Sequence, residues 1–186
     1  MKIISLHHSQ KLVIQKAIQR DRTAQKAIFD KFSPKMLGVC RQYVKDSRHA
    51  EELMLSGFLK VFTHLHKFRH EGNFENWIRR IMVNTCLSYL RKKNAIQMTD
   101  EEYVYNNYAA ENLENTSTED IQKLIDGLPK GYKMVFNLYA IEGYKHTEIA
   151  EKLNITVSTS KSQLFKARKW LQEHYHKINY MSTHGK

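Results

Sequence analysis

Proline, glycine and cysteine are scarce in this sequence of 186 residues, which has two prolines, seven glycines and two cysteines. So few helix-breaking residues, together with 41% apolar residues, predict an all-α protein. Cys40 and Cys86 lie far apart, each inside an apolar helical pattern. This placement favours buried thiols in a reducing compartment over a disulfide framework.

Long apolar runs are also missing. No basic N-terminal start leads into an apolar run of about 7–15 residues, so no signal peptide is expected. No stretch approaches the roughly 20 apolar residues that a membrane span needs. We therefore expect a cytoplasmic protein with no membrane insertion.

Signals of catalysis are missing as well. There is no glycine loop that could cradle a phosphate, no nucleophile elbow and no carboxylate pair with a plausible pocket. The histidine groups at 7–8, 64–70 and 174–176 have no cysteine or carboxylate at the spacing of a structural zinc site. The sequence thus predicts a protein that is not an enzyme and needs no cofactor and no metal.

Positive charge is plentiful, with a formal net charge of +11, and it is unevenly distributed. Residues 1–94 hold 19 Lys and Arg against 7 Asp and Glu, residues 95–128 hold 1 against 8, and residues 129–186 hold 10 against 4. A charge this far from zero predicts a polyanionic partner. The pattern predicts two small helical domains, 12–94 and 118–176, joined by an acidic flexible linker at 95–117.

The first block reads as a series of helices. Apolar residues recur at helical spacing from 12 to 32, with Asp21 as a possible cap in the middle, so one broken helix or two are both open. Ser33 and Pro34 predict a helix boundary. The segment 48–68 has two apolar stripes, which indicates either a central helix of the bundle or a second face that docks on another protein.

The segment 69–93 combines a glycine-containing loop with a helix rich in Arg, Asn and aromatic residues. Asn73 is expected to cap that helix. A loop beside Trp, Phe, Arg and Asn is suited to stacking and hydrogen bonding of flipped or single-stranded bases. The alternative is that Phe74 and Trp77 are ordinary core residues beneath a basic face.

The segment 146–168, HTEIAEKLNITVSTSKSQLFKAR, fits a helix-turn-helix. Ala150 allows close packing, Asn154 tolerates the turn, and Ser158 or Thr159 is expected to open a second helix that runs to about His176. The alternative is a plain helical hairpin with a solvated basic face. The residues expected to face duplex DNA are Ser158, Thr159, Lys161, Ser162, Phe165, Lys166 and Arg168.

Two stretches together resemble a known family. AEELMLSGFLKVFTHLHKFRHEGNFENWIRRIMVNTCLSYLRKK is similar to region 2 of RNA polymerase sigma factors of the extracytoplasmic-function group, within the sigma-70 family. LIDGLPKGYKMVFNLYAIEGYKHTEIAEKLNITVSTSKSQLFKARKWL is similar to region 4. The resemblance spans about residues 17–94 and 118–176, and implies promoter recognition, DNA melting and transcription initiation with core RNA polymerase.

The resemblance also implies partners and residue roles. Region 2 would dock on the clamp coiled coil of the polymerase and region 4 on its flap, with an anti-sigma factor as a possible inhibitor. The implied polymerase-binding residues are Glu51, Glu52, Met54, Leu55, Phe58, Leu59 and Phe62. The residues implied to open and read the single-stranded −10 element are Arg69, His70, Glu71, Gly72, Asn73, Phe74, Trp77, Arg80, Asn84 and Arg91. The helix at 159–170 would read the duplex −35 element.

Three departures from the family pattern involve four positions. Leu55 and Ser56 stand where a Gln-Glu pair is usual, and Asn154 replaces the turn glycine. Ser160 replaces a valine, so we expect a buried hydroxyl that bonds back to a carbonyl one turn earlier. Two other functions remain open: a stand-alone helix-turn-helix regulator, and a protein-interaction adaptor with incidental basic charge.

Overall fold

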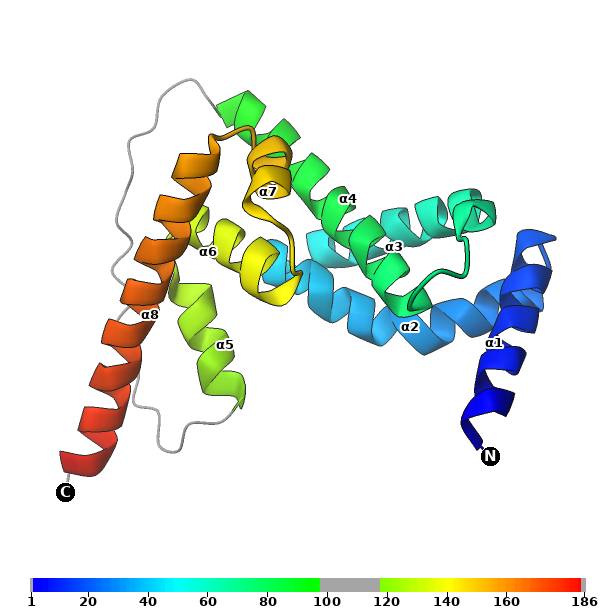
Figure 1. Ribbon diagram of the computed structural model, residues 1–186, viewed down its shortest axis with the longest axis horizontal. Helices are drawn as coiled ribbons and strands as arrows, with labels where there is room; N and C mark the ends of the chain where they lie inside the picture. The colour runs from blue at the N-terminus through cyan, green and yellow to red at the C-terminus, as the bar shows by residue number, and fades with distance from the viewer. Residues whose placement is uncertain (1, 98–117, 185–186) are drawn as a thin grey trace. The chain divides into compact units, whose positions relative to one another are not determined.

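The computed structural model describes residues 2–97 and 118–184, and the side chains of residues 10–92 and 121–175. The chain divides into two compact units, which meet in sequence between Ala95 and Ile96. Both units consist of helices, with no strand among the described residues. The predicted fold class, all-α with two helical domains, is confirmed (Figure 1). The last helix of the first unit continues through Gln97 and so includes the first residues of the predicted linker at 95–117, whose residues 98–117 lie outside the described residues.

The first unit begins with two helices, not one broken helix. Helix α1 spans Lys2–Ile18 and α2 spans Arg22–Tyr43. Between them Arg20 has a φ of 66°, which ends α1, and the Asp21 carboxylate accepts a 2.8 Å hydrogen bond from the Ala24 N–H. Asp21 thus caps α2 as the sequence indicated.

The predicted boundary at Ser33 and Pro34 is wrong, because α2 continues through both residues. A proline inside a helix removes one backbone hydrogen bond and costs about 3 kcal/mol. Helix α2 continues because its buried residues form one stripe. Ile28, Phe32, Met36 and Val39 follow one another at helical spacing on both sides of the proline. Burial of that unbroken stripe offsets the local cost.

Helices α3 and α4 complete the first unit. Asp46 caps α3 (Ser47–His64), which tightens into the 3₁₀ turn η1 (Leu65–Lys67) before α4 (Phe74–Gln97). At Gly57 a Cβ atom would lie 2.2 Å from the sulfur of buried Met82, so the glycine lets α3 and α4 approach closely. The first apolar stripe of the segment 48–68 is buried and forms a core face: Leu53, Gly57, Phe58, Val61, Leu65 and Phe68.

The two cysteines lie in this core as free, fully buried thiols. They hydrogen-bond each other, and this bond together with burial raises the pKa of the Cys86 thiol far above its usual value. Cys86 therefore stays protonated and acts as a small core residue.

The second unit consists of α5 (Thr118–Gly127), α6 (Lys130–Phe136), the π-helical turn η2 (Asn137–Ile141), α7 (His146–Leu153) and α8 (Val157–His184). Its core is formed where α6 and α7 pack on α8 and η2 packs on α6 and α7, through Val135, Leu138, Ile149, Leu164 and Ala167. Helix α8 is longer than predicted, since it continues past residue 176.

Candidate nucleic-acid and partner interfaces

The second apolar stripe of α3, formed by Met54, Leu55, Leu59 and Phe62, is exposed at its two leucines. Leu55 and Leu59 have exposed fractions of 52% and 69%, and the exposed Glu51 and Glu52 lie one turn before Leu55. The helix therefore has a solvent-facing surface, which we call the α3 face and define as Glu51, Glu52, Leu55, Leu59 and the half-buried Phe62. Exposed leucines one helical turn apart are typical of a docking surface.

Two residues predicted for partner binding on α3 belong to the core instead. Met54 and Phe58 are buried, and the ring of Phe58 lies 4.8 Å from that of Phe29 on α2 in an edge-on arrangement. The physical reason is the helix crossing: α2 covers the side of α3 on which both residues lie. Their contribution to any docking is to hold α3 in place.

The loop before α4 rests on a cluster of four aromatic rings. The Phe74 centroid lies 4.9 Å from Phe68, 5.7 Å from Phe32 and 5.9 Å from Trp77, with which it is stacked. Phe74 is only 4% exposed, so its side chain is a core anchor of the loop, the alternative that the sequence left open for it. Trp77 is half-buried, so one part of its ring supports the loop and another part stays accessible.

The conformation of the loop is set by two backbone angles and by the cap of α4. His70 and Gly72 have φ values of 57° and 91°, and Asn73 accepts a 2.8 Å hydrogen bond from the Glu75 N–H, which starts α4. The side chains of Arg69 to Asn73 are exposed, including those of Arg69 and His70. The arrangement presents charged and hydrogen-bonding groups beside an accessible tryptophan edge, as binding of unstacked bases requires.

Helix α4 continues this polar surface. Arg80, Asn84 and Arg91 are all exposed, whereas Ile78 and Met82 on the opposite side are fully buried. Arginine and asparagine at this spacing can contact successive phosphates or base edges along one strand. The predicted residues of α4 thus lie along one exposed side of the helix, which begins at the loop, and Phe74 alone of the predicted set is buried.

The predicted turn between α7 and α8 is confirmed. Asn154 adopts the left-handed conformation with φ 55° and ψ 49°, and the Ile155 N–H donates to the Ala150 carbonyl at 3.0 Å. The predicted start of the next helix is one or two residues too late. Helix α8 begins at Val157, because the Thr156 hydroxyl accepts a 3.0 Å bond from the Thr159 N–H and caps the helix.

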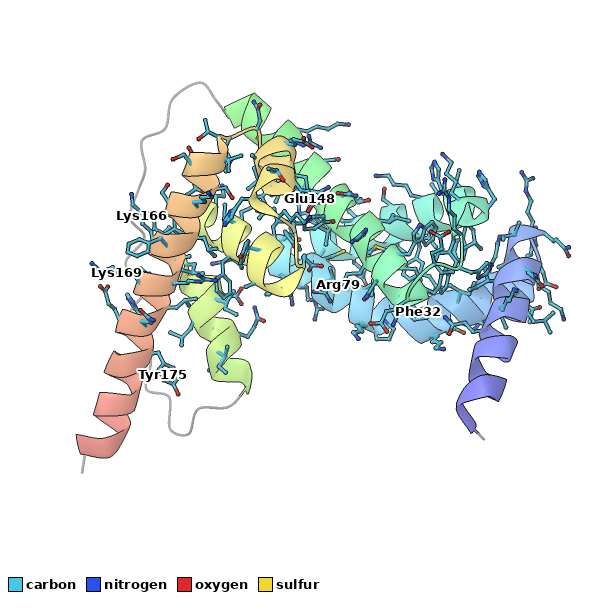
Figure 2. All side chains as sticks on the ribbon, in the orientation of Figure 1. Phe32, Arg79, Glu148, Lys166, Lys169 and Tyr175 are labelled. Atoms are coloured by element: carbon cyan, nitrogen blue, oxygen red, sulfur yellow. The ribbon has the colours of Figure 1, made fainter. Side chains whose placement is uncertain are left out.

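The outer side of α8 presents the predicted duplex-facing residues. Phe165 is 69% exposed, and Figure 2 shows Lys166 on the side of α8 that faces away from α6. Thr159 is half-buried and its hydroxyl bonds to that of Thr156 at 2.8 Å. The other predicted residues are exposed: Ser158, Lys161, Ser162, Lys166 and Arg168.

The buried hydroxyl of Ser160 has a different partner from the one expected. Ser160 is fully buried, and its Oγ lies 2.9 Å from Nδ1 of His146 at the start of α7, not on a carbonyl one turn earlier. Sequence reasoning gave His146 no role. The available signal was weak, a histidine and a buried serine 14 residues apart. Burial, with the positive charges of Lys161 and Arg168, lowers the pKa of His146.

Among the described residues, no helix could cross a membrane and no group of His, Cys, Asp or Glu is arranged to hold a metal ion.

Comparison with known proteins places both units. The sigma-70 region 2 family matches residues 28–96, and the sigma-70 region 4 family matches residues 118–171. The chain is 24% identical over 172 residues to the RNA polymerase sigma-H factor of Pseudomonas aeruginosa, covering 83% of this chain and 89% of that protein. It is 24% identical over 174 residues to the ECF RNA polymerase sigma-E factor of Haemophilus influenzae, covering 86% and 92%.

A solved structure has a similar fold. The sigma factor RpoE from Bartonella quintana, in a co-crystal with the anti-sigma factor NepR, aligns with a TM-score of 0.50 at 21% identity. The alignment covers 80% of this chain and 94% of that one. At this identity the likeness concerns the fold.

Proposed function

Since the chain belongs to the extracytoplasmic-function group of the sigma-70 family, we propose that it binds core RNA polymerase and directs promoter recognition, DNA melting and transcription initiation. This proposal rests on two exposed polar surfaces, which lie on two separate units and follow one another along the chain. The first is the loop and α4, suited to unstacked bases, and the second is the outer side of α8, suited to a major groove.

Each unit is assigned one part of the task. Residues 12–94 act as region 2, in which the α3 face docks on the clamp coiled coil. The loop and α4 open and read the −10 element through Arg69 to Asn73, Trp77, Arg80, Asn84 and Arg91. Residues 118–176 act as region 4, which contacts the flap and reads the −35 element. The linker at 95–117 passes between them, and its acidic character is suited to mimic nucleic acid in the polymerase channel.

We expect melting because the protein binds the unpaired strand and so stabilises the open state. Unstacking a base costs a few kcal/mol, and capture of the extruded base beside Trp77 offsets that cost. The exposed Arg80 and Arg91 add phosphate contacts that hold the separated strand. Duplex binding by α8 supplies the location, so that opening occurs at a fixed distance from a recognised site.

Several properties accompany this function. The protein carries out no reaction of its own, needs no small cofactor and works in the cytoplasm with the polymerase. An anti-sigma factor is a further expected partner, because exposed Leu55 and Leu59 are costly to leave in water while the protein is free. Co-purification that finds only polymerase subunits under every growth condition would contradict that expectation.

The deciding experiment is run-off transcription with core polymerase, with and without this protein, on a set of candidate promoters. We expect initiation at a subset of promoters only when the protein is present. Folded protein that stimulates no promoter would refute the proposal. A stand-alone helix-turn-helix regulator would instead bind duplex tightly without polymerase, and an interaction adaptor would show no salt-dependent DNA binding.

A further inference from the structure

One imidazole connects three elements of the second unit. His146 is the first residue of α7, and its Nδ1 lies 2.9 Å from the Ser160 hydroxyl in the first turn of α8. Its ring stacks on Tyr139 of η2, with centroids 4.6 Å apart and planes 24° apart. No apolar residue at position 146 could make both contacts, because only the ring nitrogen reaches the hydroxyl.

Tyr139 also contacts helix α8 directly, through Arg168. The Arg168 guanidinium carbon lies 5.7 Å from the centroid of the Tyr139 ring, within the range of a cation–π interaction. Helix α8 therefore makes a polar contact at Ser160 and, about two turns further on, a cation–π contact at Arg168. The partners of these two contacts are His146 and Tyr139, whose rings stack on each other.

From this arrangement we propose that His146 is a positioning residue for −35 recognition, acting through Ser160 and Tyr139; this rests on the proposed function. The hydrophobic effect is non-directional, whereas a buried hydrogen bond is directional and costs free energy when lost. Rotation of α8 about its axis would move the exposed Lys161 and Phe165 away from base edges. The bond between His146 and Ser160 thus fixes the rotation of α8 and, with it, the direction in which Lys161 and Phe165 point.

The test separates the bond from simple packing by two substitutions at one position. His146→Asn places an amide atom where Nδ1 lies and so keeps a partner for Ser160, but it has no ring to stack. His146→Phe keeps a ring on Tyr139 and has no partner for the hydroxyl. A merely structural role predicts that Phe is tolerated better, because it fills the space better.

The measured quantity is −35 discrimination by the full chain bound to core polymerase. Initiation is sequenced from a promoter library with a randomised −35 element beside a constant −10 element, and from a second library with the −10 element randomised. We expect His146→Phe to lower −35 discrimination about three- to tenfold, and His146→Asn to lower it less. Discrimination at the −10 element should stay unchanged in both.

A second variant keeps the proposal testable if either substitution unfolds the unit. Ser160→Ala removes one hydroxyl and should lower −35 discrimination as His146→Phe does. Unchanged discrimination in Ser160→Ala, or Phe at position 146 discriminating as well as Asn, would overturn the inference. Wild-type protein that initiates from neither library would instead refute the proposed function and, with it, the inference.

Discussion

The two units hold their candidate binding residues by different kinds of contact. In the first, a cluster of aromatic rings around Phe74 supports an open loop with two left-handed residues. In the second, α8 packs on the core through Leu164 and Ala167 and is fixed further by polar contacts, the Thr156 cap and the bond between His146 and Ser160. A surface that must admit a flipped base tolerates an irregular loop, whereas reading a groove requires a helix held at one angle.

The largest effect is expected from removing the aromatic anchor of the first unit. Phe74→Ala leaves a cavity between Phe32, Phe68 and Trp77, and should lower the unfolding free energy of that unit by about 3–5 kcal/mol. Each described unit has one tryptophan, so fluorescence-detected urea unfolding in a Trp170→Phe background reports the first unit alone. A loss below about 1 kcal/mol would show that the cluster does not support the loop.

The contribution of the α3 face to polymerase binding can be measured separately from the stability of the first unit. Leu59→Ala should weaken binding to core polymerase by about tenfold, because apolar area that the interface buries is removed. Leu12→Ala on α1 is the matched control, since Leu12 is 52% exposed on a different helix. Titration of labelled protein with core polymerase measures both. Equal affinities for the two variants would place the docking surface elsewhere.

The exposed phenylalanine of α8 provides the contrast with Phe74. Phe165→Ala should change the stability of the second unit by less than about 0.5 kcal/mol, because the ring is 69% exposed. Initiation from promoters with an intact −35 element should nevertheless fall about three- to tenfold, since an apolar contact with the groove is lost. If initiation is unchanged, Phe165 does not face the DNA.

The smallest effect concerns pH and applies only to the polar contacts of the second unit. The pKa of His146 in the folded state is lower than its ordinary 6.5 because of burial and the nearby Lys161 and Arg168. Its contribution to stability is therefore complete above about pH 6.5 and is lost as the pH falls through the folded-state pKa.

Unfolding of the second unit, followed through Trp170 in a Trp77→Phe background, should thus occur at lower urea concentration at pH 5.5 than at pH 7.5. His146→Asn should remove part of this difference, because asparagine does not titrate. The other histidines are common to both proteins and cancel in the comparison. An identical pH dependence in the variant would show that His146 does not titrate differently on folding.

The sequence by itself determined the helical class, the two units with their exposed basic surfaces, and the caps at Asp21 and Asn73. These features depend on residues within about four positions of each other, so periodicity and capping rules reach them. The predicted exposed residues of α4 and α8 follow from the same periodicity.

Only the tertiary structure decided that α2 continues through Pro34, that Met54, Phe58 and Phe74 belong to the core, and that Ser160 bonds to His146. Each outcome depends on which helix covers which face. Helix crossings bring together residues that are 14 or more positions apart, such as His146 and Ser160 or Phe32 and Phe74. Patterns within one helix carry no information about such partners.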